Sequence, residues 1–202
     1  MAVQACTTTL GRDILNDCNE PHAKGVEKFF YFISRDAIDW DKSTREGFVV
    51  TNLVALTGKR GYKVRNPSNE TPAITITDQN PSIDAAWDKV LPVTLLADSP
   101  ENAAAVLGLK QDKYVCIYEN MEKGDAGKQA FGVIGWEQGA TGVDLNMDKS
   151  GDVGGWTGNI TETGAPTPNL FFYKTDYATT KAALESLCSA CLLYTSPSPR
   201  DA

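Results

Sequence analysis

The feature that most constrains this chain is a pair of short apolar runs joined by a glycine-rich turn. The runs are Lys113–Met121 (KYVCIYENM) and Gln129–Gly139 (QAFGVIGWEQG), with EKGDAGK between them. β-Branched and aromatic residues favour strands, and glycine supplies the turn conformations that strands lack. The pattern predicts an antiparallel β-hairpin. Such a hairpin is stable only when further strands or a helix cover its apolar face.

Aromatic and β-branched runs elsewhere in the chain indicate further strands. They are Phe29–Ile33, Ala73–Asp78, Leu91–Asp98, Trp156–Gly164 and Asn169–Lys174. A second hairpin is expected from Phe48–Leu56 and Tyr62–Val64, because the TGKRG segment between them supplies Gly58 and Gly61 for the turn. The polar, glycine-rich stretch 140–155 is expected to be a long loop.

Two segments carry helix signals. Ser99 is a suitable N-cap for a short helix that starts at Pro100 and ends near Gly108. Asp176 is a suitable N-cap for a second helix that extends to Cys188. No internal repeat is present. The pattern predicts a β-rich α+β fold, an antiparallel sandwich or curved sheet of roughly eight strands with one or two packed helices.

The chain divides into three parts on these signals. Residues 1–25 mix glycine and proline with polar residues and show little periodicity, so we expect an N-terminal arm that gains order from contacts elsewhere. Residues 26–188 are expected to form the β-rich domain. Helical periodicity stops at Cys188, and residues 189–202 are expected to be a non-native or disordered tail.

The last part of the chain has an unusual sequence. Cys191–Asp201 reads CLLYTSPSPRD, and one set of codons for it resembles the transposase-linked adapter used to prepare fragmented DNA for sequencing. The resemblance implies a sequence assembled from environmental or shotgun reads. We therefore exclude this segment from fold reasoning, as a cloning scar would be excluded. A disordered Ser/Pro linker is the alternative interpretation.

The charge of the chain bears on its partners. The formal net charge is -7, and an acidic chain is repelled by nucleic-acid phosphate unless its basic residues are clustered. We expect no tight nucleic-acid binding. No apolar run approaches the roughly 20 residues of a membrane span, and the start MAVQACTTTLGRD lacks the pattern of a secretory signal. The expectation is synthesis in a cytoplasm, with no membrane partner.

Residues for nucleophilic or metal chemistry are few. His22 is the single histidine and lies in a polar stretch, where a solvated loop residue is expected. Cys6, Cys18, Cys116 and Cys188 are widely spaced without a CxxC pair, which favours free thiols over a disulfide framework or zinc site. A Ser-His-Asp or Cys-His pair stays open, because its members meet only in space. We expect no catalytic, cofactor-binding or metal site, no cofactor, and no enzymatic activity.

A phosphate-binding loop is suggested by the composition of GDAGK at Gly124–Lys128. The full pattern requires glycine where Glu122 stands and serine or threonine where Gln129 stands. Both positions fail. The segment is interpreted as the turn of the first hairpin.

A calcium loop is suggested by the oxygen ligands Asp144, Asn146 and Asp148, which occupy positions 1, 3 and 5 of such a loop. Lys149 replaces the glycine of the sharp turn, and Gly155 replaces the closing bidentate carboxylate. The prediction is a solvated loop, with a weak incidental cation site as the alternative.

Sugar binding would need exposed aromatic rings on one face. Trp87, Trp136 and Trp156 are candidates, although core and interface positions are more usual for tryptophan. The glycosylation sequons at Asn69 and Asn159 have meaning only in a chain secreted by a eukaryote.

The order of segments resembles a known family of structural proteins. GVEKFFYFISRDAIDW, a polar spacer and GFVVTNLVALTGKRGYKVR resemble the opening of tail-tube-type (major tail) virion proteins from phages of gut Bacteroidales. The ending ITETGAPTPNLFFYKTDYATTKAALESL is similar as well. The similarity lies in the order of the segments and in their residue composition over most of residues 1–188, and it includes no catalytic motif.

The resemblance implies a small β-sandwich that stacks into rings, expected to be hexameric, with an arm and a long hairpin bridging neighbours. It implies a virion structural protein, made in the bacterial host cytoplasm, that contacts other tail proteins and conducts DNA. The composition agrees, since segments 1–25, 65–72 and 140–155 suit arms that order on assembly. A carbohydrate- or host-surface-binding β-sandwich module and an uncharacterised hydrolase are the alternatives.

Overall fold

The computed structural model describes residues 25–65, 73–79, 86–96, 99–148 and 155–189. The expected arm and tail lie outside these ranges except for Gly25 and Ser189, as do His22, Cys6, Cys18 and Asn69. No described helix has the length and apolarity that crossing a membrane would require.

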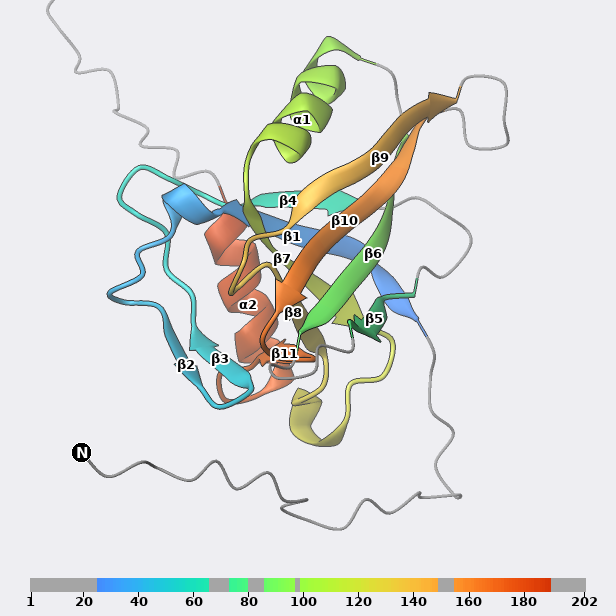
Figure 1. The fold of residues 1–202 in the computed structure, drawn as a ribbon. Helices are drawn as coiled ribbons and strands as arrows, with labels where there is room; N and C mark the ends of the chain where they lie inside the picture. The colour runs from blue at the N-terminus through green and yellow to red at the C-terminus, as the bar shows by residue number, and fades with distance from the viewer. Residues whose placement is uncertain (1–24, 66–72, 80–85, 97–98, 149–154, 190–202) are drawn as a thin grey trace, which may run out of the picture.

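The described residues form two sheets and two α-helices (Figure 1). The strands are β1 (Val26–Ser34), β2 (Thr44–Glu46), β3 (Val49–Asn52), β4 (Tyr62–Arg65), β5 (Thr75–Asp78), β6 (Trp87–Leu96), β7 (Tyr114–Asn120), β8 (Phe131–Ile134), β9 (Thr141–Asp148), β10 (Gly155–Ala165) and β11 (Leu170–Phe172). The helices are α1 (Pro100–Gln111) and α2 (Tyr177–Cys188), with short 3-10 turns η1 (Arg35–Ala37) and η2 (Asp125–Gly127).

The two sheets are open and almost entirely antiparallel. The large sheet has seven strands in the order β2-β3-β11-β8-β7-β1-β4, and the small sheet has four in the order β5-β6-β10-β9. Only β3 and β11 run parallel among the described strand pairs. The expected β-rich α+β fold is therefore confirmed.

The large sheet is covered on both faces. Along β1, Tyr31 and Ile33 pack in the core cluster that includes Leu184 of α2. Their neighbours Phe30 and Phe32 pack in the other cluster, with residues of the small sheet such as Leu91. This alternation follows from the period of two along a strand. The result is three layers in the order α2, large sheet, small sheet.

The first expected hairpin is confirmed, with η2 inside its turn. β7 pairs with β8 in the register Cys116↔Ile134 and Ile117↔Val133. At least one face of β8 was expected to be buried, and β8 is buried along its whole length. Gly132 is required here, because a Cβ atom at this position would lie 2.2 Å from the ring of Tyr118.

The second expected hairpin is wrong. β3 lies beside β2 and β11 near one edge of the large sheet, whereas β4 forms the opposite edge beside β1. The turn predicted at TGKRG is confirmed, because Lys59 N donates to Leu56 O across a local turn. After this turn the chain runs to the opposite edge of the large sheet. There Gly61 N donates to Leu187 O of α2 at 2.9 Å, just before β4 begins.

The loop expected at 140–155 is wrong at residues 141–148, and residues 149–154 lie outside the described residues. Residues 141–148 form β9, which pairs with β10. Its polar residues fit a strand because β9 is an edge strand with one neighbour, and much of it faces solvent. Residues 141–148 are ordered within the single chain, contrary to the expectation that they order only on assembly.

Both helix caps are confirmed. Ser99 Oγ accepts a hydrogen bond from Asn102 N at 3.2 Å, and Pro100 takes the first turn. α1 continues beyond Gly108 to Gln111. Asp176 accepts from Thr179 N at 2.7 Å, which fixes the start of α2.

A buried ion pair between two strands of the small sheet is linked to the large sheet by hydrogen bonds. Lys89 Nζ on β6 lies 3.1 Å from Glu162 Oε2 on β10, and both side chains are fully buried. The Glu162 carboxylate also accepts hydrogen bonds from Gly135 N, Glu137 N and Gln138 N, which follow β8. Buried charges need such partners. Glu162 therefore holds the end of the large sheet against the small sheet.

Candidate functional site

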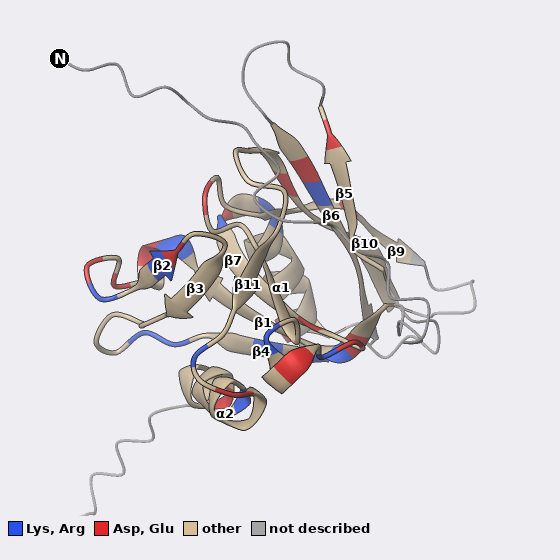
Figure 2. Cartoon of the chain, turned by 90° about the horizontal axis from the view of Figure 1, so that it is seen from below, with Lys and Arg blue, Asp and Glu red and all other residues tan. Residues whose placement is uncertain are grey.

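The outer face of the small sheet carries no basic side chain within the described residues. Its strands include one lysine, Lys89, and this residue points into the core, as Leu91 and Val93 do. Figure 2 shows the remaining charge on β5 and β6 as acidic. Asp88 is held there by Gln79 Nε2 at 2.7 Å and Gly164 N at 3.0 Å. Such a face repels phosphate.

Four strands end the two sheets: β2 and β4 in the large sheet, β5 and β9 in the small one. Large apolar side chains are exposed at or near three of these edges, namely Phe48 at 55%, Tyr62 at 51% and Val143 at 40%. Free edges with apolar side chains are templates for pairing with another chain. All four strands carry charged residues that weaken this tendency, and those of β5 and β9 are aspartates only.

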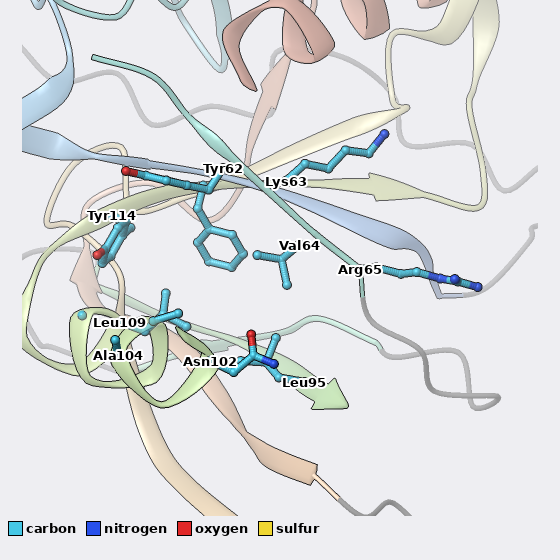
Figure 3. Close-up of a pocket in the computed structure, with 12 residues that line it drawn as sticks. Tyr62, Lys63, Val64, Arg65, Leu95, Asn102, Ala104, Leu109 and Tyr114 are labelled. Carbon is cyan, nitrogen blue, oxygen red and sulfur yellow. The ribbon is translucent and has the colours of Figure 1, made fainter. Parts of the chain in front are cut away.

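A groove of about 560 Å³ lies between α1 and β4. Figure 3 shows Tyr62 and Val64 on one side of it, Leu109 on the helix side and Tyr114 at one end. The side chains of Lys63 and Arg65 extend away from it. The groove therefore has a mainly apolar lining next to a free strand edge.

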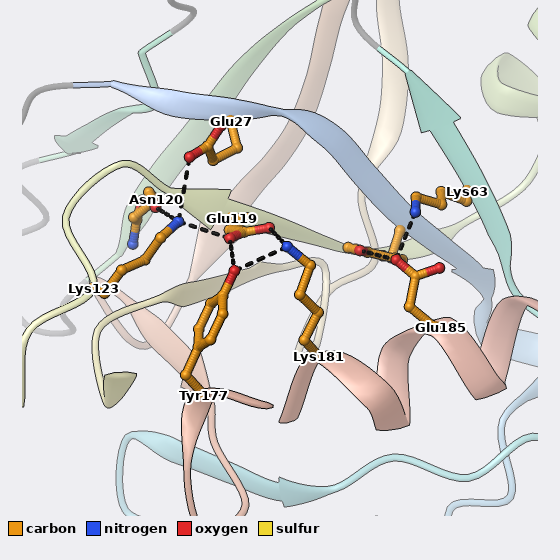
Figure 4. Close-up of polar contacts among 9 residues, drawn as sticks. Glu27, Lys63, Glu119, Asn120, Lys123, Tyr177, Lys181 and Glu185 are labelled. Carbon is orange, nitrogen blue, oxygen red and sulfur yellow. Dashed lines mark hydrogen bonds and ion pairs between the residues drawn. The ribbon is translucent and has the colours of Figure 1, made fainter. Parts of the chain in front are cut away.

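A cluster of charged groups fastens α2 to the large sheet (Figure 4). Glu119 on β7 is buried and accepts from Tyr177 Oη at 2.6 Å, Lys123 Nζ at 2.7 Å and Lys181 Nζ at 3.2 Å. Burial raises the pKa of Glu119, but the bonds from Lys123, Tyr177 and Lys181 outweigh it and hold the pKa below its ordinary value. The bond to Tyr177 raises the pKa of Lys181.

A second polar contact lies one turn along α2. Glu185 accepts from Lys63 Nζ at 2.5 Å and from Tyr31 Oη at 2.8 Å. The bond from Lys63 lowers the pKa of Glu185, and burial together with Glu185 raises the pKa of Tyr31. All these groups satisfy one another. They account for the docking of α2 and leave no open position for a substrate.

A basic cavity of about 900 Å³ lies between the segment before β4 and the end of α2. Lys59, Arg60 and Lys174 line it, with Ser186 and Ser189, and no acidic residue does. Three cations without a carboxylate suit an anion, although the carbonyl end of α2 also attracts positive charge.

The expected calcium-loop residues lie on β9, so the loop prediction is corrected. β9 pairs with β10 on both sides of a bulge at Asp144, where φ is 52°, and a strand paired in this way does not wrap an ion. Asn146 donates instead to the carbonyl of Asp144 at 2.9 Å. In the described ranges no group of three His, Cys, Asp or Glu residues could hold a metal ion.

The GDAGK segment forms the turn between β7 and β8, as predicted. Gly124 and Gly127 have φ of 64° and 80°. These values favour glycine and explain the composition without a phosphate.

The tryptophans do not form an exposed row. Trp87, Trp136 and Trp156 are all partly buried, and Trp136 packs edge-on against Trp40 with ring centroids 5.2 Å apart. Trp40 is exposed and was not among the candidates, because it follows the aromatic run that predicted β1.

The two described cysteines are free thiols. Burial raises the pKa of Cys116, and it raises that of Cys188 to about 11. Neither is an activated nucleophile, since activation requires a lowered thiol pKa.

Sequence reasoning missed the groove and the buried Lys89–Glu162 pair. The groove joins residues from β1, β4, α1 and the start of β7, which no local pattern links. One sequence feature could have indicated the ion pair. In β6 and in β10, where apolar and polar residues alternate, a charged residue stands at a position that should face the core.

Comparison with known proteins gives one partial match. No family model matches the chain, and no solved structure matches it. Over 113 residues it is 30% identical to the sn-glycerol-3-phosphate-binding periplasmic protein UgpB of Agrobacterium fabrum. The match covers 54% of this chain and 26% of that protein.

Proposed function

We propose that this chain is a virion structural protein, a subunit of a phage tail tube that assembles into stacked rings. The observation that carries the proposal is the small sheet, whose described strands place no basic side chain on the outer face and whose two end strands, β5 and β9, contain neither lysine nor arginine. A surface past which DNA slides should not bind phosphate.

The end strands of the small sheet suggest how rings form. If β5 of one copy continues the small sheet beside β9 of the next, the sheets of successive copies close into a barrel. Closure removes the edges that would otherwise aggregate. The outer face of the small sheet then lines the channel, and the large sheet with α2 forms the outside. A hexameric ring follows from the resemblance to tail-tube proteins.

The remaining partners follow from this role. The subunit contacts its own copies and other tail proteins, binds no nucleic acid tightly and uses no cofactor. It is made in the bacterial host cytoplasm, resides in the virion, and acts through its contacts rather than through catalysis.

Assembly is tested on the purified full chain. Light scattering across a concentration series should show discrete growth in mass, and negative-stain microscopy should show rings or tubes with a central channel. A β9 variant, Val143→Asp, should reduce assembly because it adds charge at the edge, while Lys110→Asp on exposed α1 should not. A chain that stays monomeric at high concentration contradicts the proposal.

A second candidate is a binding module for an anionic polyol. The partial match to a glycerol-3-phosphate-binding protein and the basic cavity at Lys59, Arg60 and Lys174 favour it. The phosphate would be held by the three cations and the hydroxyls of Ser186 and Ser189.

Calorimetry with sn-glycerol 3-phosphate separates the two candidates. Saturable binding that Lys174→Ala weakens, with inorganic phosphate and glycerol as comparison ligands, would support the module. If calorimetry shows no heat of binding at millimolar ligand and the chain assembles, only the tail-tube subunit remains as a candidate.

A further inference from the structure

We propose that a pocket of about 260 Å³ on the large sheet binds one neutral, hydroxyl-rich ring, a single sugar unit. The pocket lies where the start of β1, the end of β7, the start of β11 and the segment before β5 meet. It shares no lining residue with the groove beside α1 or with the basic cavity. The inference goes beyond the proposed function and does not depend on assembly.

The polar part of the lining consists of three amides and one carboxylate, namely Asn120, Gln129, Asn169 and Glu122. An amide offers both donors and an acceptor, and a hydroxyl group can pair with either. Among the described residues that line the pocket there is no lysine or arginine. A phosphate would therefore meet no counter-charge here, whereas a neutral hydroxyl group would find a partner of either kind.

Two of the amides are oriented by hydrogen bonds at the pocket wall. Asn169 Oδ1 accepts from the hydroxyl of the fully buried Tyr118 at 3.4 Å. Asn120 Nδ2 donates to Gln129 O at 2.7 Å. Each bond uses one end of the amide and leaves the other end for a ligand, Nδ2 of Asn169 and Oδ1 of Asn120. The pocket thus offers a donor and an acceptor from oriented side chains, a pattern that two neighbouring hydroxyl groups match.

The apolar part of the lining suits the face of a sugar ring. Phe171, Ile74 and Val26 supply this surface, and the first two are partly exposed. Apolar walls with a few placed polar groups are usual in small-molecule sites. A pyranose ring presents C–H groups on its faces and hydroxyl groups around its edge, so it uses both parts of the lining. The volume is below the roughly 300–1,000 Å³ of pockets for drug-sized ligands, which limits the occupant to one ring.

Saturation-transfer NMR on the full chain tests the site, because it observes the sugar and works for a monomer or an assembly. The probes are glucose, galactose, mannose, N-acetylglucosamine and rhamnose, each also as its methyl glycoside. We expect at least one to bind with a dissociation constant on the order of millimolar, since a single ring makes few contacts. A methyl glycoside that binds identifies the end of a glycan chain as the source. Binding of the free sugar alone identifies a free monosaccharide.

Two variants test whether the sugar occupies this pocket. Asn169→Asp keeps an acceptor for Tyr118 but replaces the amino donor, and Gln129→Ala removes an exposed amide. Each should weaken binding about two- to tenfold, as expected for one lost hydrogen bond. Gln111→Ala, which removes an exposed amide at the end of α1, is the matched control and should leave the affinity unchanged. Thermal unfolding checks that each variant is folded.

The outcomes separate this inference from the proposed function. Binding that both variants weaken and the control does not supports the site, whether or not the chain assembles. If no sugar of the panel shows saturation transfer, or if the two variants bind as the control does, the site is wrong. Displacement of the sugar by sn-glycerol 3-phosphate would overturn the assignment of a neutral ligand. The tube subunit is contradicted only by the assembly experiments, so each proposal can fail alone.

Discussion

The two sheets of this molecule use their faces differently. In the large sheet, β7 is buried from Val115 to Glu119, because α2 covers one face and the small sheet covers the other. In the small sheet, burial alternates along β6, with Lys89, Leu91 and Val93 inside and Pro92 exposed. The large sheet is an interior layer, whereas the small sheet has one buried face and one face toward solvent.

Charge follows the same division. The large sheet holds α2 through exposed and half-buried lysines paired with Glu119 and Glu185. The small sheet keeps its one described lysine inside, paired with Glu162. The large sheet therefore supplies stability within one chain, and the small sheet offers a surface and edges whose use depends on other molecules.

The largest expected effect comes from placing a charge in the interior layer. Ile117→Asp on β7 should cost several kcal/mol, on the order expected for an unpaired buried carboxylate, and should abolish cooperative unfolding. The same change at Val143 on β9 should cost less than about 1 kcal/mol, because this side chain is exposed. Thermal and urea unfolding measure both. Equal costs would remove the contrast between the sheets.

A smaller effect is expected at the ion pair of the small sheet, whose Glu162 also binds backbone N–H groups at the end of the large sheet. Glu162→Met leaves Lys89 and three backbone N–H groups without their acceptor, and should cost about 3–5 kcal/mol. Lys89→Met leaves Glu162 with its three N–H donors and should cost less. The double replacement should recover part of the loss of Glu162→Met. A Lys89→Met variant that is the less stable of the two would contradict this ranking.

Packing between the sheets gives the next effect. Gly132→Ala puts a methyl group against the Tyr118 ring and should cost about 1–3 kcal/mol. Tyr118→Leu removes the ring, so the double variant should be less destabilised than the sum of the single variants. Additive costs in a double-mutant cycle would show that the two residues do not compete for space.

Sequence patterns predicted the strands of the large sheet better than those of the small sheet. Phe29–Ile33 and the β7–β8 hairpin were recognisable because strands buried on both faces read as continuous apolar runs. Asp176 and Ser99 were recognisable because a cap is a local signal. β9 was taken for a loop because an edge strand needs few apolar residues.

Pairing between distant strands was not predictable in the same way. A turn does form at Gly58, but the segment after it pairs with β1 rather than with β3. The preference arises where Tyr31 lies opposite Lys63 and Glu185 of α2 binds both side chains. This contact joins three separate segments, and no local spacing reveals it. The groove beside β4 was missed for the same reason.

The smallest expected effect concerns the attachment of α2 and its dependence on pH. Glu119→Gln keeps the shape of the side chain but removes its charge, and should cost about 1–2 kcal/mol at pH 7, as expected for hydrogen bonds to a charged group. Because the pKa of Glu119 is lowered in the folded chain, its contribution is present above the unfolded pKa of about 4.3 and is lost as pH falls through the folded value. Urea unfolding from pH 7 to pH 3 should therefore show the wild-type and Glu119→Gln curves converging at the acid end. Glu46→Gln on the exposed strand β2 is the control and should change stability at pH 7 by less than about 0.5 kcal/mol. If the difference in free energy of unfolding between wild type and Glu119→Gln stays constant over the whole pH range, the charge of the Glu119 carboxylate does not stabilise the attachment of α2. The ion pairs between the large sheet and α2 would then add no measurable stability.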